Sequence, residues 1–93
     1  MIRSFRGRLA AAVFRRQPAA RLAPALQRLA LRKLLLLHAA TRLETLGTLP
    51  DQKIEPEKSP RVGQFGIRVG EHWRLCFWWR DGDAFETELV EGA

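Results

Sequence analysis

The sequence contains few of the residues on which disulfide-bonded and metal-binding proteins depend. Its one cysteine, Cys76, cannot form a disulfide within the chain and belongs to a residue type that is commonly buried among apolar side chains. Its two histidines, His38 and His72, lie too far apart in sequence to indicate a zinc site, and its glycines form no phosphate-binding loop. We therefore expect no metal, no cofactor and a reducing, cytoplasmic setting.

No apolar run is long enough to cross a membrane. The longest, LLLLHAA from Leu34, is far shorter than the roughly 20 residues that a bilayer-spanning helix requires. Hydrophobic residues nevertheless make up 46% of the 93 positions, which is typical of a globular protein. A chain of this length suffices for one domain, 1–93, and is too short for two.

Acidic residues are nearly absent from the N-terminal half. Residues 1–46 contain ten Lys or Arg and one acid, Glu44, giving a net charge of +9, whereas residues 47–93 contain six basic and nine acidic residues, giving −3. Thirteen of the sixteen basic residues are arginine, whose planar guanidinium suits bidentate contact with phosphate. We expect an anionic partner, of which nucleic acid is the commonest.

The same Arg-rich, acid-poor N-terminus is also typical of a mitochondrial presequence. Its removal near residue 40 would leave about 50 residues, which is below the size at which a small sheet easily folds by itself. We therefore expect the whole chain to be one folding unit.

Periodicity predicts a short strand at 2–5 and two helices after it. In RGRLAAAVFRR, residues 6–16, apolar residues recur at helical spacing until Pro18 ends the helix. Pro24 suits the first turn of the second helix. The arginines of this second helix lie on a different side from its apolar residues, where either solvation or nucleic-acid contact would account for them. The apolar residues that recur at steps of three or four are Leu22, Leu26, Leu29, Ala30, Leu34 and Leu37.

The C-terminal half changes to strand periodicity. Between Gly47 and Gly63, three prolines alternate with charged residues and predict an extended loop of the kind that carries binding or catalytic residues. Beyond it, QFGIRV, HWRLCFWWR and AFETELV alternate at every second position, with a hairpin turn at Asp81-Gly82-Asp83. The sequence thus predicts an α+β fold, in which an N-terminal strand and two to three helices pack on one face of a small, mainly antiparallel sheet. In its last two strands the residues expected to point inward are Trp73, Leu75, Phe77, Trp79, Phe85, Thr87 and Leu89.

The opposite face of this sheet gathers basic residues. Arg68 and Arg74 lie on neighbouring strands and face the same way, with Lys58 and Arg61 on the preceding loop. Such a cluster can hold a phosphodiester and stabilise the extra negative charge of its transition state. Alternatively, the arginines pair with the glutamates of AFETELV, because opposite charges stabilise neighbouring strands.

Several segments resemble the HigB-type toxins of the RelE superfamily, namely IRSFRGRLA, LHAATRLETL and above all GQFGIRVGEHWRLCFWWRDGDAF. The resemblance covers nearly the whole chain. It implies a RelE-like fold, a helix-turn-helix antitoxin as partner, and cleavage of messenger RNA on the translating ribosome without a metal. The pattern indicates no particular oligomeric state.

The resemblance also implies site residues. Lys58 in KIEPEKSPR matches a lysine that contributes to catalysis in relatives, and Glu55 occupies a position where some relatives have histidine and others glutamate. Arg74 matches the arginine of the family's Trp-Arg pair. We therefore expect the catalytic residues to be Glu55, Lys58 and Arg74, and the RNA-binding residues to be Lys53, Arg61 and Arg68.

The C-terminus departs from the family pattern. Members commonly end in an acidic residue, a tyrosine and a histidine, the last two supplying stacking and proton transfer, whereas this chain ends in Glu91, Gly92 and Ala93. Three hypotheses follow: an attenuated ribosome-dependent endoribonuclease, a disarmed toxin that still binds antitoxin and ribosome, and a gyrase-binding toxin of the related ParE branch. The Trp-Arg-x-Cys-Phe spacing favours the RNA-cleaving branch over the ParE branch.

Overall fold

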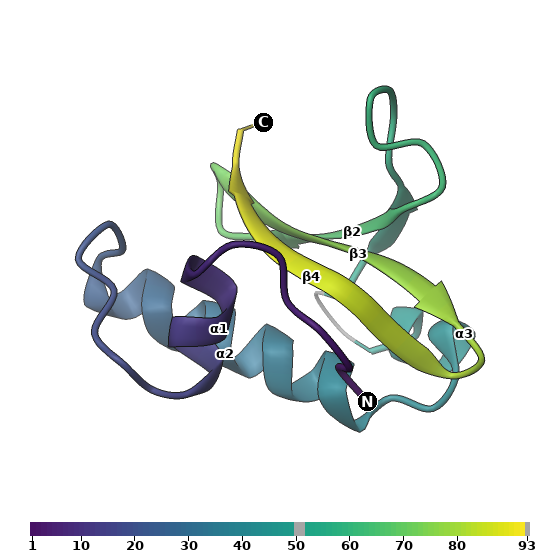
Figure 1. Cartoon of the computed structure of the whole chain (residues 1–93), viewed down its shortest axis with the longest axis horizontal. Coiled ribbons are helices and arrows are strands. Elements are labelled where there is room, and N and C mark those ends of the chain that lie inside the picture. Colours follow the sequence, from purple (N-terminus) through teal and green to yellow (C-terminus); the bar gives the residue numbers. More distant parts are fainter. Residues whose placement is uncertain (50–51, 93) are drawn as a thin grey trace.

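The computed structural model describes residues 1–49 and 52–92 and consists of helices packed against one antiparallel sheet (Figure 1). Each strand of the sheet pairs antiparallel with the next in chain order. The α+β fold predicted from the sequence is therefore confirmed. The helices are α1 (Leu9–Phe14), α2 (Pro24–Ala39) and α3 (Leu43–Gly47), and the strands are β1 (Ile54–Pro56), β2 (Phe65–Val69), β3 (Trp73–Arg80) and β4 (Asp83–Glu91).

The helix α2 supplies the largest helical part of the core. Pro24 occupies its first turn, where a backbone N–H has no helical partner in any case. Leu34 and Leu37 of α2 are fully buried. In the described part of the chain, no helix is long and apolar enough to span a bilayer. On the core face of the central strands the fully buried residues alternate as predicted, and they are Ile67, Val69, Leu75 and Phe77. Cys76 is fully buried as well, on the opposite face, where its Sγ contacts Glu57.

The helix α1 is shorter than the helix predicted at 6–16. Gly7 precedes it with a φ of 74°, and Arg16 follows it with a φ of 58°. Both values are left-handed, so a right-handed helix cannot continue through either residue.

The N-terminal segment runs parallel to β4 but makes only two isolated bridges, at Ile2 and Phe5. Between these bridges, the backbone N–H of Glu86 donates to Ser4 Oγ at 2.8 Å instead of to a backbone carbonyl. Glu86 also has a φ of 49°, which takes it out of strand geometry. The strand predicted at 2–5 is therefore interrupted by an irregularity in its neighbour.

A bulge in β4 changes which side chains face the core. Cys76 pairs with Glu88 and Trp78 pairs with Phe85, so β4 advances three residues where β3 advances two. One extra residue reverses the alternation of the strand. Phe85 consequently lies beside Trp78 on the face away from the core, and the prediction that it points inward is wrong. Ala84, fully buried, faces the core at this end of β4.

The segment predicted as a loop between Gly47 and Gly63 contains a strand. The strand β1 pairs with β2 over three positions, ending at Pro56. Proline is tolerated there because β1 is an edge strand, and its missing N–H interrupts no ladder on the outer side. Pro50, in the same segment, lies outside the described residues.

Thr87 is polar but fully buried, and its hydroxyl has no hydrogen-bond partner among residues 1–49 and 52–92. Valine has nearly the same shape without the hydroxyl. Thr87→Val should therefore raise the free energy of unfolding by about 1 kcal/mol, the typical cost of an unpaired buried polar group. Urea unfolding measures the change. Thr48→Val is the control and should not raise the free energy of unfolding, because the exposed Thr48 hydroxyl already donates to a backbone carbonyl. A loss of stability in Thr87→Val would contradict the prediction.

Candidate functional site

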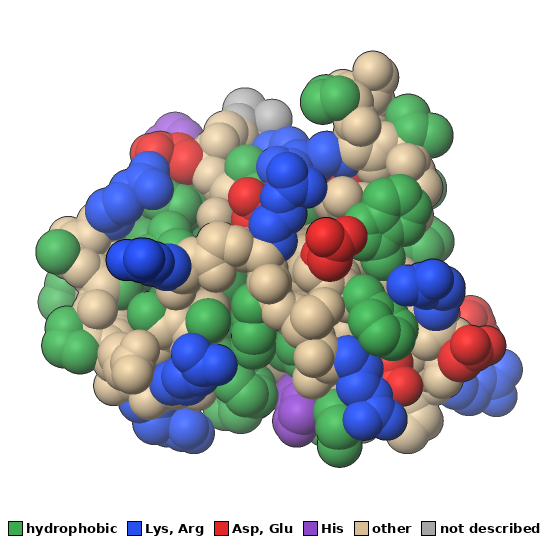
Figure 2. Space-filling view, viewed as in Figure 1, with side chains coloured by type: hydrophobic (Ala, Val, Ile, Leu, Met, Phe, Trp, Pro, Cys, Tyr) green, Lys and Arg blue, Asp and Glu red, His purple; other side chains and the backbone are tan. Residues whose placement is uncertain are grey.

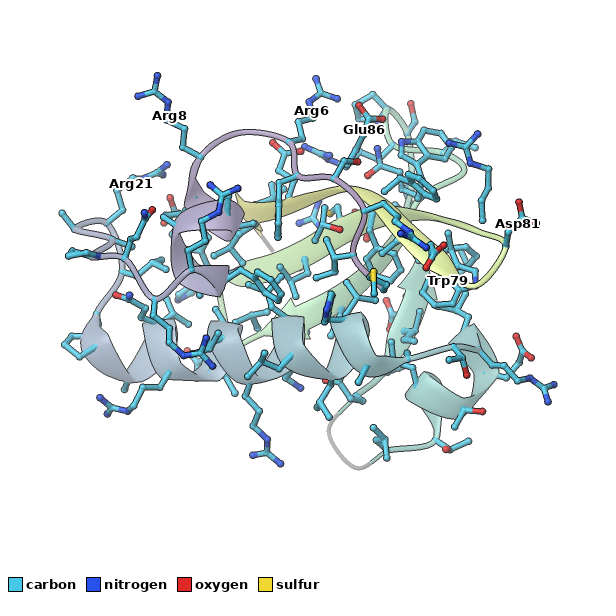
Figure 3. All side chains as sticks on the ribbon, turned by 60° about the horizontal axis from the view of Figure 1, so that its bottom comes forward. Arg6, Arg8, Arg21, Trp79, Asp81 and Glu86 are labelled. Atoms are coloured by element: carbon cyan, nitrogen blue, oxygen red, sulfur yellow. The ribbon has the colours of Figure 1, made fainter. Side chains whose placement is uncertain are left out.

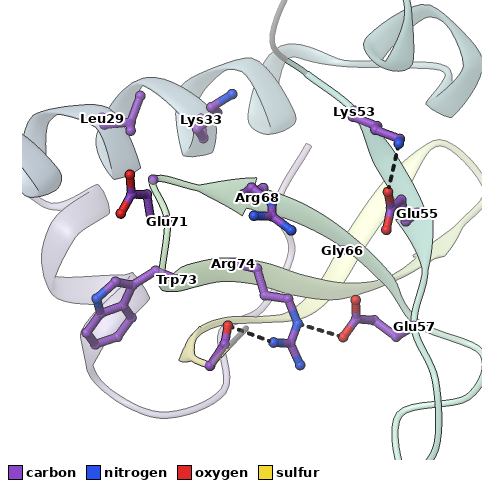
Figure 4. A pocket seen from close by; sticks show the side chains of 12 residues that line it. Leu29, Lys33, Lys53, Glu55, Glu57, Gly66, Arg68, Glu71, Trp73 and Arg74 are labelled. Carbon is purple, nitrogen blue, oxygen red and sulfur yellow. Dashed lines mark hydrogen bonds and ion pairs between the residues drawn. The ribbon is translucent and has the colours of Figure 1, made fainter.

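A cleft of about 490 Å³ opens where β1 leaves the edge of β2 uncovered (Figure 4). The strand β1 pairs only with residues 65–67 of β2, so on the side away from β3 no strand of the described chain pairs with Arg68. Leu29 and Lys33 of α2 line one side of the cleft, and Gly92 lines another. Four of the six predicted site residues line it as well, namely Lys53, Glu55, Arg68 and Arg74.

Arg68 and Arg74 lie directly opposite each other on β2 and β3, as the alternation predicted. Like charges at paired positions destabilise a sheet unless anions compensate them. Arg74 has such compensation: its Nε donates to Glu57 Oε1 at 2.9 Å, and its Nη1 donates to the carbonyl oxygen of Gly92 at 3.2 Å (Figure 4). The hydrogen bond to Glu57, above all, raises the pKa of Arg74, so this guanidinium stays charged.

Arg68 lacks such compensation within the described part of the chain. Its side chain is exposed, and its guanidinium makes no hydrogen bond or ion pair with residues 1–49 or 52–92. An available guanidinium beside a second, fixed one is suited to sharing an anion, and the planar fork of arginine matches phosphate. The two opposed arginines therefore offer a ligand one fixed and one available guanidinium.

Glu57 is the carboxylate at the centre of this arrangement, and the sequence analysis did not identify it. Its side chain is 12% exposed, and its Oε1 accepts hydrogen bonds from Arg74 Nε and from Cys76 Sγ at 3.4 Å. Gly66 makes this position possible, because a Cβ there would collide with Glu57 Oε2. If residues 54–56 are assigned to a strand that continues to Glu57, alternation places Glu57 on the same face of the sheet as Glu55, because side chains two positions apart share a face.

Lys53 and Glu55 lie on the β1 side of the cleft (Figure 4). Their side chains form an ion pair of 3.2 Å and are 83% and 61% exposed. Such an exposed pair contributes little to stability, so either partner can exchange it for a contact with a ligand. Glu55 is therefore a carboxylate that can accept a proton at the edge of the cleft.

Lys58 and Arg61 are not part of the cleft lining. Both belong to the loop between β1 and β2, which rises on the same side of the sheet as the C-terminus (Figure 1). Lys58 is exposed, whereas Arg61 donates to Glu88 Oε1 at 2.9 Å. Ion pairing with a glutamate of β4 therefore exists, but for Arg61 rather than for Arg68 or Arg74.

The C-terminal residues reach the cleft. The Gly92 N–H donates to the His72 carbonyl oxygen at 2.7 Å, while its own carbonyl accepts from Arg74. The φ of Gly92 is 143°, in a region that favours glycine. The backbone of Gly92 thus lines the cleft, but Gly92 has no side chain to contribute to it. Ala93 lies outside the described residues.

The described residues contain no group of three or more histidine, cysteine, aspartate or glutamate side chains that could hold a metal ion. His38 has a structural role instead. Its Nδ1 accepts the backbone N–H of Ile2 at 3.1 Å, and its ring packs edge-on against Phe14.

Comparison with known proteins assigns this chain to no family. No protein-family model matches it, and no curated protein matches it significantly. A functional assignment therefore depends on the chemistry of the cleft and on the motifs in the sequence.

Cys76 gives the stability of the protein a defined pH dependence. Burial, reinforced by the Glu57 carboxylate, raises the pKa of its thiol from 9.0 to about 11. An unfolded chain releases this proton near pH 9, whereas the folded chain retains it, so the stability from Cys76 is complete below pH 9 and is lost as the pH rises through about 11. Urea unfolding at a series of pH values should show this decline, and Cys76→Ala should lack it. Identical pH profiles for the two proteins would contradict the assignment.

Arg74 and Arg68 should differ in their effect on stability. Arg74→Ala leaves the Glu57 carboxylate largely buried without its counter-ion, which should lower the free energy of unfolding by about 1–3 kcal/mol. Arg68→Ala removes an exposed charge that Arg74 repels, so the free energy of unfolding should change by no more than about 0.5 kcal/mol. Urea unfolding measures both.

The double variant Glu57→Gln, Arg74→Ala is the control for the coupling between Glu57 and Arg74, and it is compared with the two single variants Glu57→Gln and Arg74→Ala. It should recover part of the loss, because no uncompensated charge then remains buried. Strict additivity of the two single changes would show that Glu57 and Arg74 are not coupled.

Proposed function

We propose that this chain is the toxin component of a type II toxin–antitoxin system, of the HigB type within the RelE superfamily, and that it is a ribosome-dependent messenger-RNA endoribonuclease of reduced activity. The observation that carries the proposal is the opposed pair Arg68 and Arg74 in a cleft that also receives Gly92. In a toxin of this family, the site that binds the phosphodiester would have to lie next to the active-site residues at the C-terminus. Both arginines come from the motifs that resemble the family, GQFGIRV and WRLCF.

Cleavage of RNA without a metal uses the substrate's own 2′-hydroxyl, which attacks the adjacent phosphorus while the 5′-oxygen leaves. Arg68 and Arg74 would stabilise the negative charge that develops on the phosphate oxygens. Glu55 would accept the proton of the 2′-hydroxyl. Glu57 would act through Arg74 by fixing its guanidinium. Lys58, expected to be catalytic, does not line the cleft, so it would instead contact a neighbouring phosphate, as Lys53 would.

The leaving oxygen also requires a proton, and Gly92 has no side chain to donate one. A positioned general acid or base typically contributes about 100- to 10,000-fold in rate. We therefore infer slow cleavage together with intact binding. The same missing side chain favours a second candidate function, that of an inactive homologue that binds only antitoxin and ribosome.

The proposed partners are the ribosome with its messenger RNA and a helix-turn-helix antitoxin, and the proposed location is the cytoplasm. The net charge of +9 over residues 1–46 favours an antitoxin that presents an acidic or mixed segment to the N-terminal half. Electrostatic attraction of this kind speeds association and weakens as salt is added.

Messenger-RNA cleavage by the purified protein, with and without ribosomes, tests the proposal. We expect slow, ribosome-dependent cleavage by the parent chain and a gain of about 100-fold or more from the double change Gly92→Tyr, Ala93→His. Tyrosine must adopt the unfavourable φ of 143° at position 92, so the gain should lie toward the lower end of the range for a restored general acid.

Arg68→Ala in the restored chain is the matched control. It should abolish the gain while leaving stability unchanged, because Arg68 has no partner among the described residues. Equal cleavage rates before and after restoration of the C-terminus would move proton transfer to Glu55, Glu91 or His72. Absence of both cleavage and ribosome binding in the parent and restored chains would contradict the toxin proposal itself.

A further inference from the structure

The outer face of α2 carries a hollow that is separate from the cleft. This open groove of about 430 Å³ is lined by Arg28, Leu31, Arg32, Leu35 and Leu36. The residues recur at intervals of three or four, or are adjacent, so they occupy one side of the helix. The fully buried leucines of α2 occupy the other side, and none of the groove residues lines the cleft.

The groove continues toward α1. A smaller hollow of about 240 Å³ shares Arg28 and Leu31 with it and extends to Val13, Arg16 and Pro24. We call the combined surface the arginine–leucine groove. Its leucines are Leu31, Leu35 and Leu36, and its basic residues are Arg16, Arg28 and Arg32.

The apolar part of this groove is open to solvent. Leu35 is 39% exposed, and it lies beside the half-buried Leu31 and Leu36. A single exposed leucine is ordinary, but Leu35 adjoins two partly exposed leucines in the same groove, and contiguous apolar surface of this kind marks an interaction site.

The basic part of the groove is not neutralised. Arg16, Arg28 and Arg32 are exposed, and their guanidinium groups make no hydrogen bond or ion pair with the described residues. The one acid of residues 1–46, Glu44, is ion-paired with Arg42 at 3.2 Å. In Figure 2, basic and apolar side chains are interspersed over the helical part of the molecule, whereas acidic ones lie mainly over the sheet.

We propose that the arginine–leucine groove binds an acidic amphipathic helix of a protein partner. Leucines of that helix would cover Leu31, Leu35 and Leu36, and its carboxylates would pair with the flanking arginines. A nucleic acid would satisfy the arginines but leave the leucines in water. A second copy of this chain would bring the same positive groove against itself, which charge repulsion opposes.

This inference rests on the charge and shape of the groove and is independent of RNA cleavage in the cleft. An antitoxin of the kind proposed above is one protein that could carry such a helix. Loss of RNA cleavage and loss of helix binding would be separate results, because different residues carry the two surfaces.

The probe is a fluorescently labelled synthetic helix of about 18 residues, with leucine at every third or fourth position and glutamate between them, and anisotropy measures its affinity for the full chain. We expect Leu35→Ser and Arg32→Glu each to weaken binding roughly tenfold or more. Arg6→Glu is the matched control, since it makes the same charge change on the N-terminal segment, away from α2 (Figure 3). Its effect should stay below about threefold, as expected for a distant charge.

A second helix with lysine in place of glutamate should not bind. Equal affinity for the two helices, or an unchanged affinity in Leu35→Ser, would overturn the inference.

Binding of poly-uridine RNA that is weakened by Arg32→Glu but not by Leu35→Ser would make the groove a nucleic-acid surface instead. Dimers in sedimentation that dissociate in Leu35→Ser would assign it to a second copy. Thermal melting checks that each variant folds, and Arg32→Gln replaces Arg32→Glu if charge reversal impairs folding.

Discussion

The hydrogen bond between Glu57 and Arg74 connects parts of the chain that are distant in sequence. It fixes the end of the edge strand β1 against β3, compensates one of two opposed guanidinium groups, and through Arg74 holds the carbonyl of Gly92. Because the Glu57 side chain is largely buried, removal of either partner leaves a charge where solvation is poor. The shape of the cleft therefore depends on this one pair.

The two cleft arginines consequently have different tasks. Arg74 is fixed before any ligand arrives, so it loses little freedom when an anion binds, and such preorganisation strengthens electrostatic stabilisation. Arg68 is exposed and has no partner among the described residues, so it is available to the ligand. Gly66 and Cys76 contribute by being small, because they leave the space in which the Glu57 carboxylate crosses the sheet.

The cleft and the arginine–leucine groove use arginine in contrasting surroundings. In the cleft, carboxylates of β1 and its following loop lie beside the cations, so binding involves exchange of existing partners. In the groove the arginines face solvent beside leucines, and a partner would supply both the missing charge and the missing apolar cover. These surfaces suit ligands of different chemistry, a phosphodiester in one and an acidic helix in the other.

The sequence by itself determined the helix α2, the alternating core of β2 and β3, and the shared face of Arg68 and Arg74, because local periodicity decides which side of an element is buried. Only the tertiary structure decided that Glu57 is central, that Lys58 lies outside the cleft and that Phe85 faces away from the core. These outcomes depend on strand register, on one bulge and on a contact across 17 residues, and such non-local pairings leave no repeating signal in the chain.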